Sequence, residues 1–349
     1  MKNELVCFAS ANTRYGFSGF FAERFADVGK LYILKGGPGT GKGRFLRDVA
    51  TCARARGYTV EEILCSSDPL SLDAVVLRKG NDALAIADGT APHVMEPDVP
   101  GVREELINLG AFWDSDRLQK EKSRILTLEQ YRRACWKRAY DALAAAGKAE
   151  DVAVSLWEPT VEQSMIDALA ERLSARIGTG DGFSEEHLFQ DGMGMRGVVH
   201  LDGIRKMAQP CVLIRRFYGL EYRLNTALHA CARKRGHHVV SVHDPFDPSR
   251  LNGIYLPQSG VGFLIAEQID AETHAIDLRR CVRRDAWRAV RGEVRSVLRL
   301  RDDLMRLALS CMARAGEYHF ELEDIYGHAM DFAQKEKACE NFCARVLPE

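Results

Sequence analysis

Short apolar segments alternate with amphipathic ones in the first third of the chain. Residues 30–35 form a short apolar run, and residues 83–87 form a continuous one, which is typical of a strand with helices on both faces of its sheet. Between these runs, apolar residues recur with helical spacing over residues 44–56, and Gly57 is suited to end that helix. Alternating strands and helices predict an α/β fold with a parallel sheet.

Further segments extend this pattern. Residues 59–65 should form a second strand, and the sequence Ser-Asp-Pro at 67–69 is suited to start a helix. Residues 114–150 and 285–345 are long, charged and almost free of Gly and Pro. We therefore expect them to be helical arms attached to the α/β core.

The chain repeats itself at an offset of 179 residues. Ten positions between residues 52 and 77 are identical to those 179 residues further on, and they include an Asp-Pro pair. Two copies of one α/β unit are therefore expected. The boundary should lie in the glycine-rich stretch 178–182, which gives a first domain of residues 1–180 and a second of residues 181–349.

The most specific motif is a glycine-rich loop between an expected strand and an expected helix. The sequence from Gly36 to Lys42 fits the pattern G-x-x-x-x-G-K. Glycines let the backbone curl so that amide groups point at phosphate oxygens, and the helix N-terminus and Lys42 add positive charge. The loop is therefore predicted to bind the phosphates of a nucleoside triphosphate, with ATP as the expected ligand. Its expected contact residues are Gly36, Gly37, Pro38, Gly39, Thr40, Gly41, Lys42, Gly43 and Arg44.

A carboxylate is expected beside this loop. Asp88 ends the apolar run 83–87, and ligands bind at the carboxyl ends of strands in open α/β sheets. Asp88 could hold Mg²⁺ directly or through water, so Lys42 and Asp88 are the predicted catalytic residues and Asp88 is the predicted metal ligand. Thr90 and His93 could orient water or sense the γ-phosphate, although a purely structural histidine is an equal alternative.

The loop departs from the common motif directly after its lysine. Ser or Thr normally stands there and reaches Mg²⁺, but this chain has Gly43, which weakens the case for fast hydrolysis more than the case for binding. Asp68 and Asp73 follow a strand end and are further site candidates. Capping of a helix or turn is the favoured interpretation of both.

The second copy of the loop has lost most of these features. Residues 215–222 align with the first loop, but Glu221 stands in the place of Lys42 and bulky side chains replace glycines. A carboxylate there would repel phosphate, so the second half should keep the fold without binding a triphosphate. Arg215 and Arg216 could face solvent, which is favoured, or could reach into the first site.

Together these features resemble a bacterial family of tandem P-loop proteins described as ATP-binding or ATPase-like. The resemblance rests on the duplication and on four motifs, at residues 34–42, 65–73, 88–93 and 108–114. It implies two P-loop NTPase-like units, each of three α/β/α layers, with helical arms. Such families typically have Ser after the lysine and an intact second loop, and this chain has neither. The Gly-Lys-Gly of the loop is also similar to that of adenylate kinases, which have Thr at the position of Arg44.

Length, charge and cysteine content limit the expected location of the protein and its expected binding partners. The chain has 349 residues, which suits two domains, and a formal net charge of −1, which gives no overall attraction to nucleic acid or membrane. Its ten cysteines are scattered and no run reaches the ~20 apolar residues of a membrane span, so a cytoplasmic protein is expected. Residues 279–301 hold nine arginines and two acids, but nucleic-acid binding is the less favoured interpretation of this stretch.

Two classes of function remain open on these observations. An enzyme, most simply an Mg²⁺-dependent ATPase with a second substrate, would need Lys42 and Asp88 for turnover, and a nucleotide kinase-like phosphotransferase is a variant of it. A non-hydrolysing nucleotide sensor, read by a protein partner, would bind ATP without turnover, and Gly43 favours it. The enzyme is the favoured hypothesis because Lys42 and Asp88 are both present.

Overall fold

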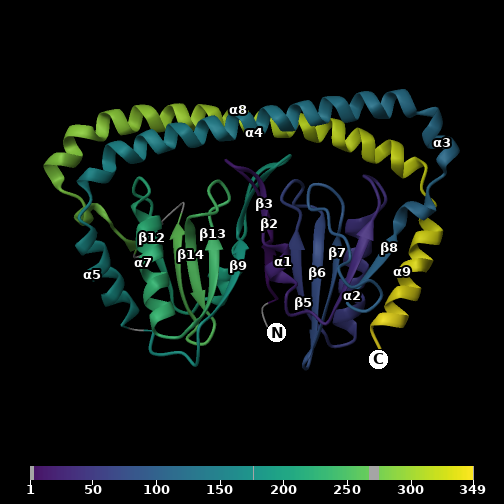
Figure 1. Ribbon diagram of the computed structural model, residues 1–349, viewed down its shortest axis with the longest axis horizontal. Coiled ribbons are helices and arrows are strands. Elements are labelled where there is room, and N and C mark those ends of the chain that lie inside the picture. Colours follow the sequence, from purple (N-terminus) through teal and green to yellow (C-terminus); the bar gives the residue numbers. More distant parts are fainter. Residues whose placement is uncertain (1–3, 176, 267–274, 349) are drawn as a thin grey trace.

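The computed structural model describes residues 4–175, 177–266 and 275–348. In these residues the chain forms one mixed β-sheet of twelve strands, with helices packed on its faces and two long helices lying along one end of it (Figure 1). The predicted α/β class is therefore confirmed, whereas the expectation of a parallel sheet is wrong.

The sheet consists of two halves with the same strand order. In the first half the order is β1 (Val6–Phe8), β5 (Thr59–Leu64), β6 (Leu72–Lys79), β7 (Asp82–Asp88), β4 (Lys30–Lys35) and β8 (Glu104–Asn108). In the second half it is β9 (Ser184–Phe189), β13 (His238–His243), β14 (Leu251–Leu256), β15 (Val261–Ala266), β12 (Cys211–Arg215) and β16 (Ala275–Ile276). The halves meet where β1 pairs with β9, antiparallel, at Phe8 and Phe189.

One interior strand in each half runs against its neighbours. β6 pairs antiparallel with both β5 and β7, and β14 does the same with β13 and β15. The Ser-Asp-Pro sequence at 67–69 leads into β6 through a tight turn, in which Ser71 N donates to Asp68 O at 2.8 Å. The predicted helix at this point is therefore wrong. Residues 72–77 are buried at every position, as an interior strand requires, and Asp and Pro serve a turn.

Helices of matching position occur in both halves. Those of the first half are α1 (Phe21–Arg24), α2 (Lys42–Ala55), α3 (Ser115–Lys120), α4 (Lys122–Trp157) and α5 (Gln163–Ser174). Those of the second half are α6 (Gly203–Met207), α7 (Leu220–Lys234), α8 (Arg284–His328) and α9 (Phe332–Val346). Each half also has a hairpin, β2 (Ser10–Thr13) with β3 (Gly16–Gly19) and β10 (Asp191–Gly194) with β11 (Gly197–His200), and short 3₁₀ turns, η1 (Leu109–Phe112), η2 (Glu158–Thr160) and η3 (Arg279–Cys281). Within the described residues we find no helix long and apolar enough to cross a lipid bilayer.

Helices cover both faces of the first half of the sheet. On one face, Ile86 of β7 packs in a cluster with Phe45 of α2. On the other face, Ala85 and Ala87 of the same strand pack in a cluster with Phe21 of α1. Alternate residues of β7 are therefore buried on opposite faces, which explains why the predicted strand is continuously apolar.

Each half ends in a helix that packs on the other half. α4 and α8 lie antiparallel and side by side across the end of the whole sheet (Figure 1). α4 carries α5 to the second half, where α5 packs on α7, and α8 carries α9 to the first half, where α9 packs on α2. The chain segments 1–180 and 181–349 are thus joined by one sheet and by exchanged helices.

Backbone hydrogen bonds hold the exchanged helices at both ends. Residues 112–114 share two such bonds with residues 329–331, at 2.9 and 2.8 Å. Residues 160–162 share two with residues 281–283, at 2.8 and 2.9 Å. The start of α9 is therefore fixed to the first half in the same way as the start of α5 is fixed to the second.

The two hairpins exchange ion pairs in the same reciprocal manner. Arg14, in the β2–β3 turn, reaches Asp247 of the second half, with Nη1 and Oδ2 3.4 Å apart. Arg196, in the β10–β11 turn, reaches Asp68 of the first half, with Nε and Oδ1 2.5 Å apart. Asp68 also accepts a hydrogen bond from Leu70 N at 3.2 Å, which agrees with the capping role favoured for it.

The packing of α9 on the first half can be tested through Phe342. Its ring is almost fully buried and contacts Tyr32 of β4 (centroids 4.9 Å apart) and Phe45 of α2 (5.5 Å). We predict that Phe342→Ala lowers the free energy of unfolding by roughly 3–5 kcal/mol, because it leaves a cavity between the halves. Urea denaturation would measure this loss.

Leu307→Ala, at an exposed position of α8, is the control and should change the free energy of unfolding by less than about 0.5 kcal/mol. A loss for Phe342→Ala as small as that of the control would contradict the docking of α9.

Candidate phosphate-binding site

The glycine-rich loop joins β4 to α2 and lies against α8. Gly39 and Gly41 have φ angles of 70° and 77°, in the left-handed region, where a side chain would be strained. A Cβ added to Gly39 would also lie 2.4 Å from Glu323 O of α8. The backbone conformation and the close approach of α8 therefore both require glycine at this position.

The amide groups of the loop are available to an anion. Those of Gly39, Gly41, Lys42 and Gly43 donate no hydrogen bond to any residue that the structure describes. They lie at the start of α2, a helix of 14 residues, where the helix dipole favours negative charge. Successive amides at such a helix start make the kind of site that binds phosphate.

Lys42 folds back over the loop. Its Nζ donates to the carbonyl oxygens of Gly36 and Gly37 at 2.8 Å each, and lies 3.6 Å from Oδ2 of Asp88. Only 13% of the lysine side chain and 12% of the aspartate side chain are exposed, so salt screens their attraction less than it would at the surface. The two predicted catalytic residues thus lie together at the loop.

Other loop side chains support the backbone or point outward. Thr40 is fully buried and its hydroxyl donates to Gly37 O at 2.9 Å, so it braces the loop. Arg44 is exposed, and its Nε pairs with Oδ1 of Asp48 at 2.9 Å, one turn further along α2. Neither side chain is directed at the space beside Gly43.

Asp88 is oriented by its neighbours in sequence. The parallel register places it opposite Leu34 of β4, just before the loop begins. Its Oδ1 accepts hydrogen bonds from the amide and the hydroxyl of Thr90, at 2.9 and 2.7 Å, and its Oδ2 faces Lys42. Thr90 therefore positions the carboxylate.

A second buried carboxylate belongs to the same cluster. Asp73 is the extra residue of a bulge where β5 and β6 shift register, and its Oδ2 lies 3.3 Å from Nε2 of the buried His93. Burial disfavours the charged form of His93, but the carboxylates of Asp73 and Asp88 outweigh it and raise the pKa of His93 to about 9. His93 is therefore positively charged at neutral pH. The capping role favoured for Asp73 is wrong, since its side chain pairs with His93.

A hydroxyl from another segment fills the space beside Gly43. A Cβ added to Gly43 would lie 2.4 Å from Oγ of Ser71, which is closer than side chains pack. This hydroxyl makes no hydrogen bond with the residues that the structure describes. The motif lacks a hydroxyl in sequence, but one is present beside the same position in space.

Residues of α8 and α9, together with Trp113, cover part of the loop. Gly37 lies against Trp113 and Tyr326, since a Cβ there would be 3.4 and 4.0 Å from their rings. Gly41 lies against Phe332 and Lys335 of α9 in the same way, at 3.6 and 3.5 Å. Nothing in the local sequence marks Tyr326, Phe332 and Lys335 as neighbours of the loop, because the crossing of α8 and the exchange of α9 bring them there.

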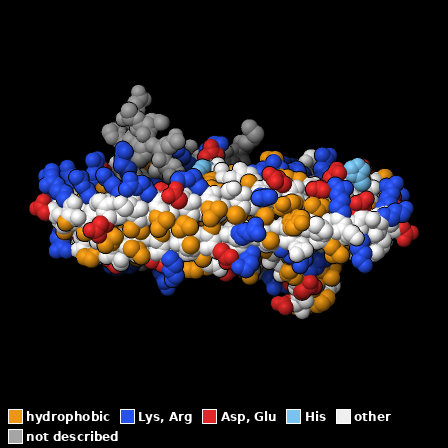
Figure 2. All heavy atoms as spheres, turned by 90° about the horizontal axis from the view of Figure 1, so that it is seen from above, with side chains coloured by type: hydrophobic (Ala, Val, Ile, Leu, Met, Phe, Trp, Pro, Cys, Tyr) orange, Lys and Arg blue, Asp and Glu red, His pale blue; other side chains and the backbone are white. Residues whose placement is uncertain are grey.

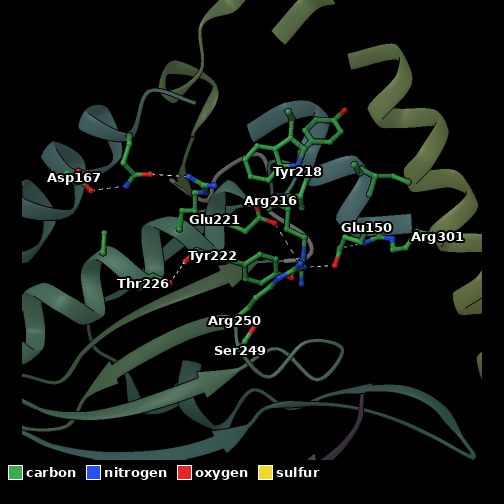
Figure 3. Close-up of a pocket in the computed structure, with 18 of the residues that line it drawn as sticks. Glu150, Asp167, Arg216, Tyr218, Glu221, Tyr222, Thr226, Ser249, Arg250 and Arg301 are labelled. Atoms are coloured by element: carbon green, nitrogen blue, oxygen red, sulfur yellow. Dashed lines mark hydrogen bonds and ion pairs between the residues drawn. The ribbon is translucent and has the colours of Figure 1, made fainter. Parts of the chain in front are cut away.

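The second loop binds its own carboxylate. It lies beside a cavity of about 640 Å³ between α4, α5, α7 and α8 (Figure 3). Oε2 of Glu221 accepts hydrogen bonds from the amides of Phe217 (2.8 Å) and Gly219 (3.0 Å), and burial raises the pKa of this carboxyl group. An internal carboxylate therefore engages amides of the second loop, which is a physical reason for the expected loss of triphosphate binding.

Arginines around this cavity have internal partners. Glu150 pairs with Arg250 at 2.5 Å and with Arg301 at 3.0 Å, as the dashed lines of Figure 3 show. Arg216 donates to the Tyr222 hydroxyl at 2.9 Å, within the second half. β12, which precedes Arg216, and β4 lie near opposite edges of the sheet, so the idea that Arg215 and Arg216 reach the first site is wrong.

Arginines at the start of α8 form an exposed basic surface. Figure 2 shows Lys and Arg side chains gathered at the left end of the helix pair, over the second half. The arginines that recur with helical spacing between residues 280 and 299 form a stripe that is only partly helical, because Arg280 lies in η3 before α8 begins. Its exposed members on α8 are Arg284, Arg288, Arg291, Arg295 and Arg299. Arg288 pairs with Asp285 at 3.4 Å, and Arg295 donates to the Tyr218 hydroxyl at 3.1 Å.

Comparisons with known proteins identify no relative of this chain. No protein family matches the chain, and searches of the curated proteins and of the solved structures find no similar protein. Function is therefore inferred from the first loop and its surroundings.

The charged His93 should make stability depend on pH. Its pKa is raised from 6.5 to about 9, so the stabilisation is complete below about pH 6.5 and is lost as the pH rises through about 9. We predict that the free energy of unfolding falls over this range by up to about 3 kcal/mol more in the wild type than in His93→Gln. Urea denaturation at a series of pH values would measure the difference. Equal pH dependence in the two proteins would contradict the His93–Asp73 ion pair.

Proposed function

We propose that the first loop binds the triphosphate of a nucleotide, with ATP as the expected nucleotide, together with Mg²⁺. The observation that carries this proposal is the set of available amides at the start of α2, with Lys42 and Asp88 beside them, 3.6 Å apart. Phosphate oxygens would accept hydrogen bonds from these amides and from Nζ of Lys42. Such bonds to a charged acceptor are stronger than those that Lys42 makes to the loop carbonyls.

In this proposal the protein consists of two related P-loop-like units, each of three α/β/α layers, and only the first binds a nucleotide. Three observations support it: the repeat at an offset of 179 residues, the equal strand order of the two halves, and the matching place of the two loops. Each loop joins a strand, β4 or β12, to a helix, α2 or α7. The resemblance to the tandem P-loop family fits the same arrangement.

The residues beside the loop fit a magnesium ion that is held mainly by the nucleotide. Within the described ranges, no group of three or more His, Cys, Asp and Glu side chains could hold a metal ion. Mg²⁺ in nucleotide sites is commonly bound by one or two carboxylates together with phosphate oxygens and water, so Asp88 suffices. The Ser71 hydroxyl takes the place of the hydroxyl that normally follows the lysine. The bound ion would neutralise charge on the phosphates.

Hydrolysis of the nucleotide is the favoured reaction, and the cluster assigns roles to its residues. Lys42 binds the outer phosphates, and Asp88, positioned by Thr90, holds the ion. His93 is protonated at neutral pH because its pKa is about 9, so it cannot accept a proton from an attacking water. Of the two active roles expected for His93, contact with the γ-phosphate is the one that its positive charge favours.

A nucleotide sensor is the second candidate, and the covering of the loop by α8 and α9 favours it. Gly39 packs directly on the backbone of α8 at Glu323, and Gly41 packs on Lys335 of α9. A ligand that moves the loop would therefore move the helix pair, and a protein partner could read that change. The sensor would bind ATP without releasing phosphate.

ATP binding and phosphate release should separate these candidates. We predict that calorimetric titration detects ATP binding to the wild type, and that Lys42→Ala weakens it at least about tenfold because a charged hydrogen-bond donor is lost. Lys234→Ala, at an exposed position of α7, is the control and should bind as the wild type does.

Phosphate release in the same samples would favour the enzyme, and binding without release would favour the sensor. No binding at millimolar ATP would refute the proposed function.

The role of Ser71 can be tested by moving its hydroxyl. We predict that Ser71→Ala weakens ATP binding when Mg²⁺ is present and has no effect when the metal is removed with EDTA. The double variant Ser71→Gly, Gly43→Ser should restore the metal-dependent part of the affinity, because it places a hydroxyl at the usual position and removes the clash at 2.4 Å.

Titrations with and without Mg²⁺ give both affinities. A loss in Ser71→Ala that is equal in the two conditions, or no loss at all, would show that Ser71 does not act on the metal.

A further inference from the structure

A buried lysine of α9 lies beside the loop without an acidic partner. Lys335 is only 1% exposed. Its ammonium group makes no ion pair and no hydrogen bond with the residues that the structure describes. Lysine is almost never fully buried unless it is paired, because an uncompensated charge in the interior is strongly unfavourable.

The ammonium group of Lys335 lies next to the available amides. A Cβ added to Gly41 would be 3.8 Å from its Nζ, and Gly41 is the N-cap residue of α2. The positive end of the helix dipole and the ammonium group are thus close together and repel each other. Two acids of this region already have partners, since Asp88 pairs with Lys42 and Asp48 with Arg44.

The equivalent position in the other exchanged helix is apolar. Asp331 N and Glu162 N make matching backbone hydrogen bonds at the starts of α9 and α5, so Lys335 corresponds to Ile166. Ile166 is fully buried and packs in the apolar cluster beneath the second loop. The fold therefore accommodates an ordinary apolar side chain at this position, and it has a lysine only beside the loop whose amides are available.

We propose that Lys335 binds the phosphates of the nucleotide as a second lysine beside Lys42, and that the second half of the chain thereby completes the site of the first. This inference rests on the proposed function. It explains the buried charge, because the phosphate oxygens supply the counter-charge that the described residues do not. It also links nucleotide binding to the docking of α9 on the first half.

The test compares Lys335→Ile, which copies the residue of α5, with Lys337→Ile, at an exposed position of the same helix. We expect Lys335→Ile to weaken the binding of ATP and of inorganic tripolyphosphate by a similar factor of about ten or more, since the lysine contacts phosphate and not the base. The control should bind both probes as the wild type does. Lys335→Gln serves the same purpose should the isoleucine variant fail to fold.

Thermal unfolding gives a second readout that a merely structural lysine would not produce. Without nucleotide, Lys335→Ile should unfold at a higher temperature than the wild type, because it removes a buried charge that has no acidic partner. Added ATP should then raise its unfolding temperature less than that of the wild type. A structural lysine would instead give a variant that unfolds at a lower temperature and binds ATP unchanged.

The outcomes separate this inference from the proposed function. Wild-type protein that binds neither ATP nor tripolyphosphate would refute both. Binding that is lost in Lys42→Ala but unchanged in Lys335→Ile would overturn the role of Lys335 alone.

Discussion

The exchange of terminal helices between the two halves is the constraint on which the rest of the structure depends. α4 and α8 cross the whole sheet, so α5 covers α7 and α9 covers α2. The core of the first half includes Phe342 of α9 and Leu347, which directly follows this helix, and neither could be there without the crossing of α8. The surroundings of the first loop follow from the same exchange, because Glu323 and Lys335 come from the other end of the chain.

Local sequence patterns predict the elements that surround the loop, and they fail where tertiary burial decides. β4, α2 and β7 lie where their apolar runs and helical spacing place them. Ser-Asp-Pro at 67–69 suits a helix start and a turn equally well, and the outcome depends on the burial of residues 72–77 between two strands. The neighbouring strands therefore decide between helix and turn at residues 67–69, and the local sequence does not show which strands will be neighbours.

The residues of the candidate site likewise fall into those that local sequence predicts and those that only the tertiary structure brings to the loop. Lys42 and Asp88 could be predicted because the ends of neighbouring parallel strands meet at one edge of a sheet. Lys335 could not, since the path of two long helices brings it to the loop. The position of Ser71 could be predicted only indirectly. Gly43 stands where a residue with a hydroxyl is usual, and such a glycine indicates that a neighbouring side chain fills the space. His93 was recognised, but its charge depends on Asp73, which the bulge in β6 brings within 3.3 Å.

Opposite charges at one position give the two loops their different character. Lys42 leaves the loop amides available and donates to carbonyls, whereas Glu221, which aligns with Lys42 in the sequence repeat, accepts from two amides of its own loop. The exchanged helices also differ, since Lys335 of α9 lies beside the first loop and the corresponding residue of α5 is the apolar Ile166. The first loop thus has two lysines beside it, whereas the residues that correspond to them are Glu221 and Ile166. This difference follows if the first loop holds an external anion and the second loop holds its own carboxylate.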